Sequence, residues 1–428
     1  MLAISLNLLA QQVAKKPLKI EDFKDWNTIV NEKISNNGEY ISFEINPQKG
    51  DGNLIVKNGE GTDTIPRGNK AAFGSENNFI VFHIKQPEDK IRKAKKDKVQ
   101  KDKMPKDSLG IYVFANDSAV KFPKVKSFKI PEENAEWVAI IIEPEQEKKD
   151  TTQKEVTKKG KKPIKQPGDN LVLFDVQTSD TLVYKNVIDY SYAKKGSAVY
   201  FVQQTKDSLN TFSTLNIFDT ETGTKKQLYT SEGWLKKTVA NETGEKYAFI
   251  FSQDTIKEKV YSLFYGSLES EPEKIVDSYS QGIPVGWSPS ENGSIYFSEN
   301  GEKLYLGTAE SPVPEPKDSL IDEDKPKLDI WNWKDLKLQP QQKVEAEREK
   351  KRTFLAVYHI DLNRFIQLAD LNIKQISTIQ KGNGDVGLAY DDKPYLRASS
   401  WTGNRSRDYY IVDFKSGIKR EMGKDKSS

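Results

Sequence analysis

One short pattern recurs about seven times along the chain: a turn that carries Gly, Asn or Asp, followed at once by an apolar run. The apolar runs include YISFEI, FIVFHI, WVAIII and AVYFVQ, and the turn positions are Gly38, Asn77, Asn134, Gly196, Gly244, Gly293 and Gly384. Gly and Asn provide the backbone conformations of tight turns, and Val, Ile, Tyr and Phe suit a pleated, half-buried surface. Each copy therefore predicts a strand that follows a tight turn.

The spacing of these turns defines a repeat. Gly38 and Asn77 are 39 residues apart, Gly196 and Gly244 are 48 apart, and the longer intervals contain charged insertions at about 90–107, 145–169 and 311–352. A second apolar run with a polar turn lies downstream, as in VLFDVQTSD, NIFDTETGT, YHIDLNRF and YIVDFKSG. Two hairpins per unit at a period of 40 to 50 residues are typical of a β-propeller. We expect an all-β propeller of about seven four-stranded blades, either complete or incomplete, with long charged insertions between blades.

The composition agrees with thin sheets and large solvated connections. Charged residues make up 30% of the 428 residues and hydrophobic residues 36%. Lys and Arg total 66 against 63 for Asp and Glu, a balance that does not indicate a nucleic-acid partner. The chain has no cysteine, which excludes disulfides and thiolate metal sites.

The insertions differ in character. Both 90–107 and 145–169 are rich in Lys and lack an apolar face, so we expect mobile, solvated loops between blades rather than a patch that binds polyanions or membranes. Residues 341–352 (QQKVEAEREKKR) combine helix formers with acidic-before-basic neighbours, which predicts a short exposed helix. Just before this helix, Trp331 and Trp333 would share one face of a strand, and packing is the expected role.

The N-terminal segment LAISLNLLA resembles the end of a secretory signal peptide, although it lacks a basic leader. The alternatives are a frayed terminus or a first buried strand. We expect residues 1–12 to be a signal-peptide remnant, residues 13–428 to form the propeller, and the protein to be periplasmic or secreted. No run approaches the ~20 apolar residues of a membrane-spanning helix.

Motifs for enzyme chemistry are weak in this sequence. Gly286–Ser290 is the nearest match to the Gly-x-Ser-x-Gly elbow, but Pro289 and Ser290 replace the helix entry and the last Gly, so Ser288 is expected in the opening turn of a blade. His83 and His359 both lie within apolar alternation and are expected to pack in strands. We therefore assign no catalytic residue.

Metal and cofactor sites are not predicted either. Two histidines in separate blades without cysteine cannot form the usual zinc ligand set. The acidic run Asp322-Glu323-Asp324 lacks the ligand spacing of a calcium loop, and a solvated loop is expected there. No Gly-rich phosphate-binding loop is present.

Several longer phrases carry a resemblance to a known family. The phrases are WNTIVNEKISNNGEYISFEINPQKGDGNL, KDKMPKDSLGIYV, DIWNWKDLKLQPQQ, RTFLAVYHID and KPYLRASSWTGNRSRDYYIVD. In this order they resemble the amino-terminal half of large bacterial serine peptidases of the prolyl oligopeptidase family (S9), over nearly the whole chain after residue 17.

That resemblance implies a propeller that restricts entry to peptides and precedes an α/β-hydrolase domain holding Ser, Asp and His. The sequence ends at Ser428 before any elbow motif, so no catalytic residue of the family can be placed on it, and we expect this chain alone to be inactive as a peptidase. Its partners would be peptide substrates that reach the missing hydrolase. An incomplete propeller would also leave an unpaired sheet edge, through which chains can associate.

Two further comparisons leave alternatives open. Glu132-Glu133 invites comparison with the glutamate pair that holds the substrate amino terminus in dipeptidyl-peptidase propellers, but its place in the turn PEEN argues against that role. The chain could instead be a free-standing binding module for protein or glycan partners. Trp401 is a candidate anchor for such a module, although packing between blades is the favoured role for it.

Overall fold

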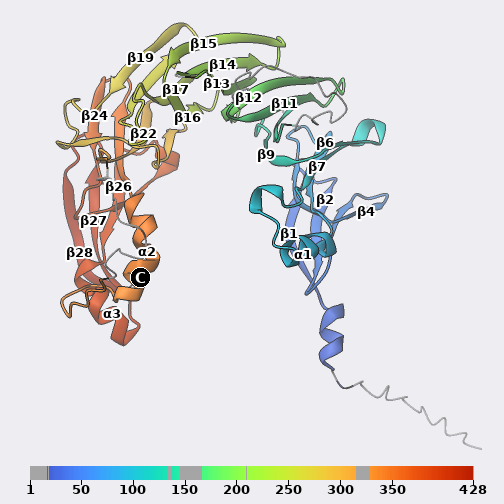
Figure 1. Cartoon of the computed structure of the whole chain (residues 1–428), viewed down its shortest axis with the longest axis horizontal. Helices are drawn as coiled ribbons and strands as arrows, with labels where there is room; N and C mark the ends of the chain where they lie inside the picture. Colours follow the sequence, from blue (N-terminus) through green and yellow to red (C-terminus); the bar gives the residue numbers. More distant parts are fainter. Residues whose placement is uncertain are drawn as a thin grey trace, which may run out of the picture. The chain divides into compact units, whose positions relative to one another are not determined.

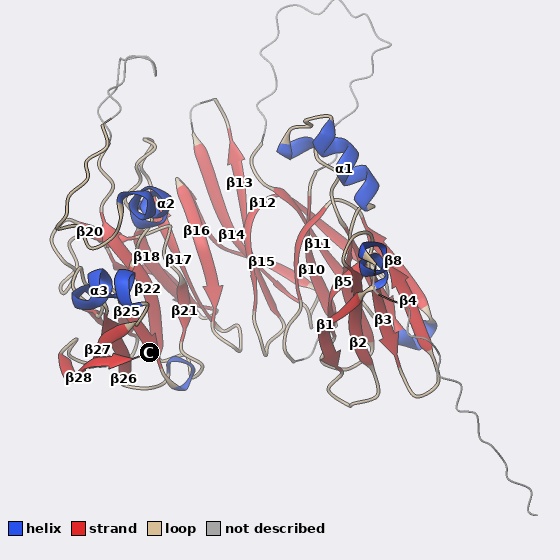
Figure 2. Cartoon of the chain, turned by 90° about the horizontal axis from the view of Figure 1, so that it is seen from below, coloured by secondary structure: helices blue, strands red, loops and turns tan. Residues whose placement is uncertain are grey.

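The computed structural model describes residues 17, 19–133, 136–144, 166–208, 210–314 and 328–427. The chain divides into two compact units, Met1–Val125 and Lys126–Ser428. Antiparallel strands dominate both units (Figures 1 and 2). Within the described residues, we find no helix with the length and apolarity needed to cross a membrane.

The first unit contains two four-stranded sheets in which the strands pair in chain order. Blade 1 consists of β1 (Asn27–Ile34), β2 (Ile41–Pro47), β3 (Asn53–Lys57) and β4 (Thr62–Pro66). Blade 2 consists of β5 (Gly68–Phe73), β6 (Phe79–Ile84), β7 (Ser108–Val113) and β8 (Ser118–Phe122). The 3-10 helix η1 (Ile20–Asp25) precedes β1.

The second unit begins with a seven-stranded sheet. Its strands are β9 (Val125–Lys129), β10 (Trp137–Ile142), β11 (Asp169–Asp175), β12 (Thr181–Tyr192), β13 (Ala198–Lys206), β14 (Thr211–Asp219) and β15 (Thr224–Glu232). Strand β12 changes partner along its length, because residues 181–184 pair with β11 and residues 189–192 pair with β13. Asn186, at a φ of 60°, marks the bulge between the two parts. The sheet is therefore two blades, 3 and 4, that share β12.

Three more sheets complete the second unit. Blade 5 consists of β16 (Trp234–Ala240), β17 (Lys246–Ser252), β18 (Ser262–Ser267) and β19 (Ser270–Val276). Blade 6 consists of β20 (Trp287–Pro289), β21 (Ile295–Phe297), β22 (Lys303–Glu310), β23 (Phe354–His359) and β24 (Arg364–Gln367). Blade 7 consists of β25 (Gln375–Thr378), β26 (Val386–Asp391), β27 (Ser406–Asp413) and β28 (Lys419–Ser427). These sheets confirm the expected propeller of about seven blades.

Strand β13, the second strand of blade 4, is buried on both faces. In β13, Val199 and Phe201 pack in the cluster shared with blade 3, whereas Tyr200 and Val202 pack in the cluster shared with blade 5. A strand covered on both sides is continuously apolar rather than alternating, which explains the run AVYFV. Blades 5 and 6 share a similar cluster, and so do blades 6 and 7.

The recurring turn joins the first and second strands of a blade. Gly38, Gly244 and Gly301 have φ between 68° and 80°, and Asn77 has φ 58° at the corresponding position. Gly tolerates this left-handed conformation without a steric cost, and Asn tolerates it better than most residues. Asn134 and Ala135, predicted to form this turn in blade 3, lie outside the described residues.

One predicted turn is assigned to the wrong copy of the motif. Gly293 lies in the loop between β20 and β21, two short strands that both pair with β22. The equivalent of Gly38 is Gly301, because the segments SNNGE (35–39) and SENGE (298–302) make the same hydrogen bonds. In both, the Ser hydroxyl donates to the Asn oxygen at 2.7 Å, and the Glu backbone N–H donates to that same oxygen at 3.2 Å.

The second predicted hairpin turn is confirmed at the end of the third strand. The carboxylate oxygens of Asp175, Asp219 and Asp413 accept the backbone N–H two residues later, at 2.8 Å, 2.9 Å and 3.0 Å. An Asp side chain that bonds to its own turn stabilises the turn locally. This contact explains why an Asp ends so many of the apolar runs.

The three charged insertions join strands within a blade, which differs from the expectation that they lie between blades. Each one connects a second strand to a third. These are β6 to β7, β10 to β11, and β22 to β23, because in blade 6 the short strands β20 and β21 both pair with β22 and together take the place of a first strand. Residues 145–165 of the second insertion lie outside the described residues. The third insertion contains α2 (Gln339–Lys350), which confirms the predicted exposed helix because none of its residues is fully buried.

The first half of the first insertion is a helix, where a loop was expected, and the residues after Lys96 are mostly irregular. α1 (Glu88–Lys96) buries Ala94, begins with Glu88 and Asp89, and ends with Lys93, Lys95 and Lys96. Acidic residues at the N-terminus and basic residues at the C-terminus of a helix interact favourably with its dipole. The Lys-rich composition that favoured a loop therefore stabilises the last turn of a helix.

Buried polar contacts tie one blade to the turn of the next. The Tyr200 hydroxyl donates to the Gly244 carbonyl at 2.6 Å, and the Tyr305 hydroxyl donates to the Gly382 carbonyl at 2.7 Å. Lys303, which is only 5% exposed, donates to the Asn383 carbonyl at 2.6 Å. These contacts connect second strands to turns in the following blade.

We predict that Tyr200→Phe and Tyr305→Phe each lower the free energy of unfolding by about 1–2 kcal/mol, because each leaves a buried carbonyl without its donor. Urea denaturation followed by circular dichroism measures the change. Tyr279→Phe is the matched control, since Tyr279 is 94% exposed. Equal stability of all three variants would show that the hydroxyl contacts contribute nothing.

A second prediction concerns acid stability. Asp385 pairs with Lys303 at 2.8 Å and with Lys415 at 2.7 Å. The hydrogen bond from Lys303, followed by that from Lys415, lowers the pKa of Asp385 to about 2. This folded-state pKa lies below the unfolded value of about 3.9, so the pair stabilises the fold above pH ~4, and that contribution is lost as the pH falls toward 2.

We expect Asp385→Asn to cost about 1 kcal/mol or less at pH 7, because the carboxylate is half-exposed, and to cost nothing near pH 2. Urea midpoints at pH 7, 4 and 2.5 test this, with Lys415→Gln as the milder comparison because it removes only the exposed partner. A difference between wild type and Asp385→Asn that stays constant with pH would contradict the assignment.

Candidate functional site

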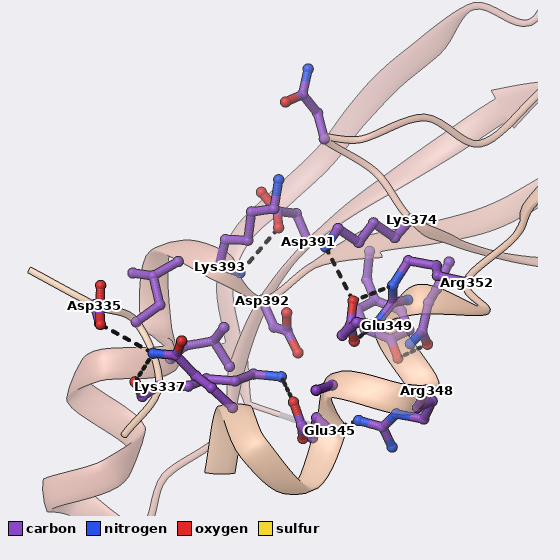
Figure 3. A pocket seen from close by; sticks show the side chains of 17 residues that line it. Asp335, Lys337, Glu345, Arg348, Glu349, Arg352, Lys374, Asp391, Asp392 and Lys393 are labelled. Carbon is purple, nitrogen blue, oxygen red and sulfur yellow. Dashed lines mark hydrogen bonds and ion pairs between the residues drawn. The ribbon is translucent and has the colours of Figure 1, made fainter. Parts of the chain in front are cut away.

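Within each blade, the connection between the second and third strands lies at one end of the sheet. In an antiparallel meander, this connection and the link to the next blade lie at the same end, opposite the recurring turns. In blades 6 and 7 three such segments meet: the insertion with α2, the link 368–374, and the connection 392–405 with α3 (Leu396–Thr402). They enclose a cleft of about 650 Å³ (Figure 3).

One wall of the cleft is formed by α2 and its flanking residues. Glu345 pairs with Lys337 at 2.5 Å and with Arg348 at 3.0 Å. Glu349 accepts from Arg352 Nε at 2.7 Å and lies 4.0 Å from Lys374 Nζ. The hydrogen bond from Arg352 is the main cause that lowers the pKa of Glu349, and the bond from Lys337 lowers that of Glu345. Each carboxylate is shared by two cations.

The opposite wall belongs to blade 7. Lys393 Nζ donates to the Leu371 carbonyl at 2.7 Å, and the Lys393 backbone N–H donates to Asp391 at 3.0 Å. Asp392 and Tyr390 also line this wall. Figure 3 shows the α2 side chains and those of blade 7 facing the same space. The cleft therefore presents both signs of charge to a ligand.

The tryptophans near this cleft are exposed, and the expectation that they pack is wrong. Trp331 and Trp333 are 65% and 79% exposed, and Trp401, on α3, is 87% exposed. The segment 328–338 is an irregular turn before α2 rather than a strand, so no neighbouring sheet covers it. Cations flank the Trp333 ring, with Lys334 at 5.5 Å and Arg397 at 5.8 Å from its centroid.

The nucleophile and base candidates occupy structural positions. Ser288 is buried in the short strand β20 at the start of blade 6, whereas the opening turn of a blade was expected there. His359 is buried at the end of β23, where its Nε2 hydrogen-bonds to the Phe414 carbonyl at 2.8 Å. His83 is half-buried in β6, and burial, followed by the charge of Lys70, lowers its pKa. Both histidines thus pack in strands, as predicted.

The remaining candidate residues are the glutamate pair Glu132-Glu133 and the acidic run 322–324. Glu132 and Glu133 lie in the turn after β9, where both backbone N–H groups donate to the Lys194 carbonyl at 2.6 Å and 3.1 Å. That contact supports the turn interpretation. Asp322, Glu323 and Asp324 lie outside the described residues. Across the part of the chain that the structure describes, no cluster of three or more His, Asp or Glu residues could hold a metal ion.

Sequence reasoning did not identify the cleft residues. Lys374 and Lys393 stand alone in ordinary surface segments, and α2 was predicted only as an exposed helix. The usable signal was positional, since the insertion of blade 6 and the sequence KPYLRASSW of blade 7 both follow a second strand. Residues at equivalent points of adjacent blades lie at the same end.

No family model matches the chain, and no curated protein matches it. The propeller domain of the Trilobed protease from Pyrococcus furiosus aligns at 9% identity over 94% of this chain and 100% of that chain, with a TM-score of 0.38. Pyrococcus horikoshii acylaminoacyl peptidase aligns at 9% identity over 94% of this chain and 53% of that chain, with a TM-score of 0.38. A prolyl endopeptidase aligns at 10% identity over 95% and 51%, with a TM-score of 0.41. The chain spans about half the length of these two peptidases.

Proposed function

We propose that the chain is the propeller portion of an exported serine peptidase of the prolyl oligopeptidase family, and that it admits extended peptides and excludes folded proteins. The sequence resemblance supplies the family. The structural observation that supports the proposal is the charged cleft between α2 and blade 7, with exposed tryptophans beside it. The catalytic Ser, Asp and His would belong to a hydrolase domain.

The cleft suits an extended peptide for chemical reasons. Its volume of about 650 Å³ lies in the range of ligand pockets and can take a short peptide segment. An extended peptide offers unpaired backbone groups and side chains of either charge, and the walls carry ammonium, guanidinium, carboxylate and amide groups. A folded protein has paired its backbone groups and is too bulky to enter.

We predict that the purified chain does not hydrolyse chromogenic prolyl or alanyl peptides and is not labelled by a serine-reactive fluorophosphonate. Ser288 and His359 are buried in strands, so neither can meet a substrate. Mass spectrometry after labelling gives a direct readout, with a known serine peptidase as the positive control. Hydrolysis that is blocked by labelling of one serine of this chain would overturn the proposal.

The second candidate is a free-standing module that binds a protein or glycan partner. Trp331, Trp333 and Trp401 favour it, because exposed Trp residues are enriched at binding hot spots. Trp331 and Trp333 lie on the segment before α2, and Trp333 lies 5.8 Å from the guanidinium of Arg397 on α3, the helix that also carries Trp401.

For this second candidate, Trp333→Ala combined with Trp401→Ala should weaken binding of a partner by about tenfold or more while the melting temperature stays unchanged, because both rings are exposed. A glycan array and surface plasmon resonance measure the binding. Tyr279→Ala is the control, since it removes an equally exposed aromatic ring outside these insertions. Unchanged binding in the double variant would exclude the tryptophans as anchors.

A further inference from the structure

We propose that the cleft between α2 and blade 7 is a carboxylate-binding subsite, which holds either the C-terminal carboxylate or an acidic side chain of a bound peptide. The inference deepens the proposed function and rests on it, because it names the part of a peptide that the cleft recognises. Its contacts would be Arg352 and Lys374, with Lys337 and Lys393 adding positive charge.

The cations at this wall have fewer carboxylate partners than they can use. Arg352 binds Glu349 through both Nε, at 2.7 Å, and Nη2, whereas Lys374 Nζ lies 4.0 Å from the same carboxylate, beyond a direct hydrogen bond. An ammonium group carries three donors, and the guanidinium of Arg352 carries five, of which the Glu349 contact uses two. Lys374 therefore retains N–H groups that can donate hydrogen bonds to a second carboxylate.

The neighbouring cations are arranged in the same way. Glu345 is shared between Lys337 and Arg348, so one negative charge faces two positive charges there as well. Lys393 Nζ donates to the backbone carbonyl of Leu371, a neutral acceptor that leaves its charge uncompensated by that bond. Two of the carboxylates of the cleft are thus each shared by two cations, and Lys393 Nζ is bound to a neutral group.

The pKa of Lys374 reflects the cations beside it. Its pKa is lowered by burial first and then by the charge of Arg352, while Lys393 and Lys337 act in the same direction. Glu349 is the opposing group that raises the pKa. A bound carboxylate would relieve the repulsion among these cations, which gives a ligand an electrostatic gain in addition to its hydrogen bonds.

The acidic residues of the cleft limit the places where a ligand carboxylate can bind. Asp335 accepts from Gln342 Nε2 at 3.1 Å, and Asp391 accepts the Lys393 backbone N–H at 3.0 Å. With Asp392, Glu345 and Glu349 they balance the five cations Lys337, Arg348, Arg352, Lys374 and Lys393 in formal charge. A carboxylate is therefore not attracted by net charge, and it must lie against Arg352 and Lys374 to bind.

Isothermal titration calorimetry of the full chain with three acetylated six-residue Ala/Gly peptides tests the inference. One peptide is the free acid, one is the C-terminal amide, and one is the amide with a central Glu. We expect the free acid, the Glu peptide or both to bind about tenfold or more tightly than the neutral amide, as one charge-assisted hydrogen bond implies. Whichever peptide binds tightly identifies the source of the carboxylate.

The variants Lys374→Gln and Arg352→Gln should each remove this preference, whereas Arg352→Lys, which keeps the charge, should retain part of it. Lys350→Gln is the matched control: Lys350 lies on the same helix, its side chain is 67% exposed, and it pairs with Glu347 outside the cleft. Melting temperatures verify that each variant is folded.

Three peptides that bind equally well, or a preference that survives Lys374→Gln and Arg352→Gln, would overturn the carboxylate subsite and leave the peptide-admitting function standing. Failure of all three peptides to bind would overturn both. A loss of preference in Lys350→Gln equal to that in Lys374→Gln would also overturn the subsite, because it would reveal an effect of helix charge in general.

Discussion

No blade of this chain can bury its own apolar faces, and this constraint shapes the rest of the structure. A second strand such as β13 sends Val199 and Phe201 to one neighbouring blade and Tyr200 and Val202 to the other. Stability in such an array comes from interfaces between consecutive repeats as well as from each repeat itself. Apolar packing alone does not select one position of a blade against the next. The hydroxyls of Tyr200 and Tyr305 each donate to one carbonyl in the turn of the following blade, and these hydrogen bonds favour a single arrangement.

The fold could be predicted because its signals are local. A tight turn and the strand after it lie within about ten residues of each other, so SNNGEYISFEI predicts a turn followed by a strand, and the run AVYFV predicts a strand that is buried on both faces. Blade 6 shows the limit of this approach. Its sequence contains two Asn-Gly pairs, at Asn292 and at Asn300, and only the hydrogen bonds of Ser298 and Glu302 identify the second as the blade turn. The position of the insertions was wrong for a similar reason. Their charged composition shows that they are connections, but it does not show which two strands they connect.

The site could not be predicted in the same way, because it is built from residues that are distant in sequence. Lys374 precedes the first strand of blade 7, Arg352 follows α2, and Lys393 follows β26; each one looks like an ordinary surface residue. The tryptophans were misjudged for a related reason. Alternation in WNW suggests a strand face, but a strand needs a neighbour to pair with, and residues 328–338 have none in the described structure. Whether a segment pairs with another strand depends on the tertiary structure, and the spacing of two tryptophans does not reveal it.

The two ends of the blades differ in how much they contribute to the contacts between blades. The end with the recurring turns holds the polar contacts of Tyr200, Lys303 and Tyr305 with the next blade, and Gly38, Gly244 and Gly301 adopt left-handed backbone conformations there. The other end carries α2, which has no fully buried residue and so adds little to any core. Its charges are held by one another and by Lys374, not by packing against a sheet. We expect substitution there to change the chemistry of the cleft walls while the interfaces between blades stay intact, so an array of this kind can vary the surface at one end of its blades independently of its fold.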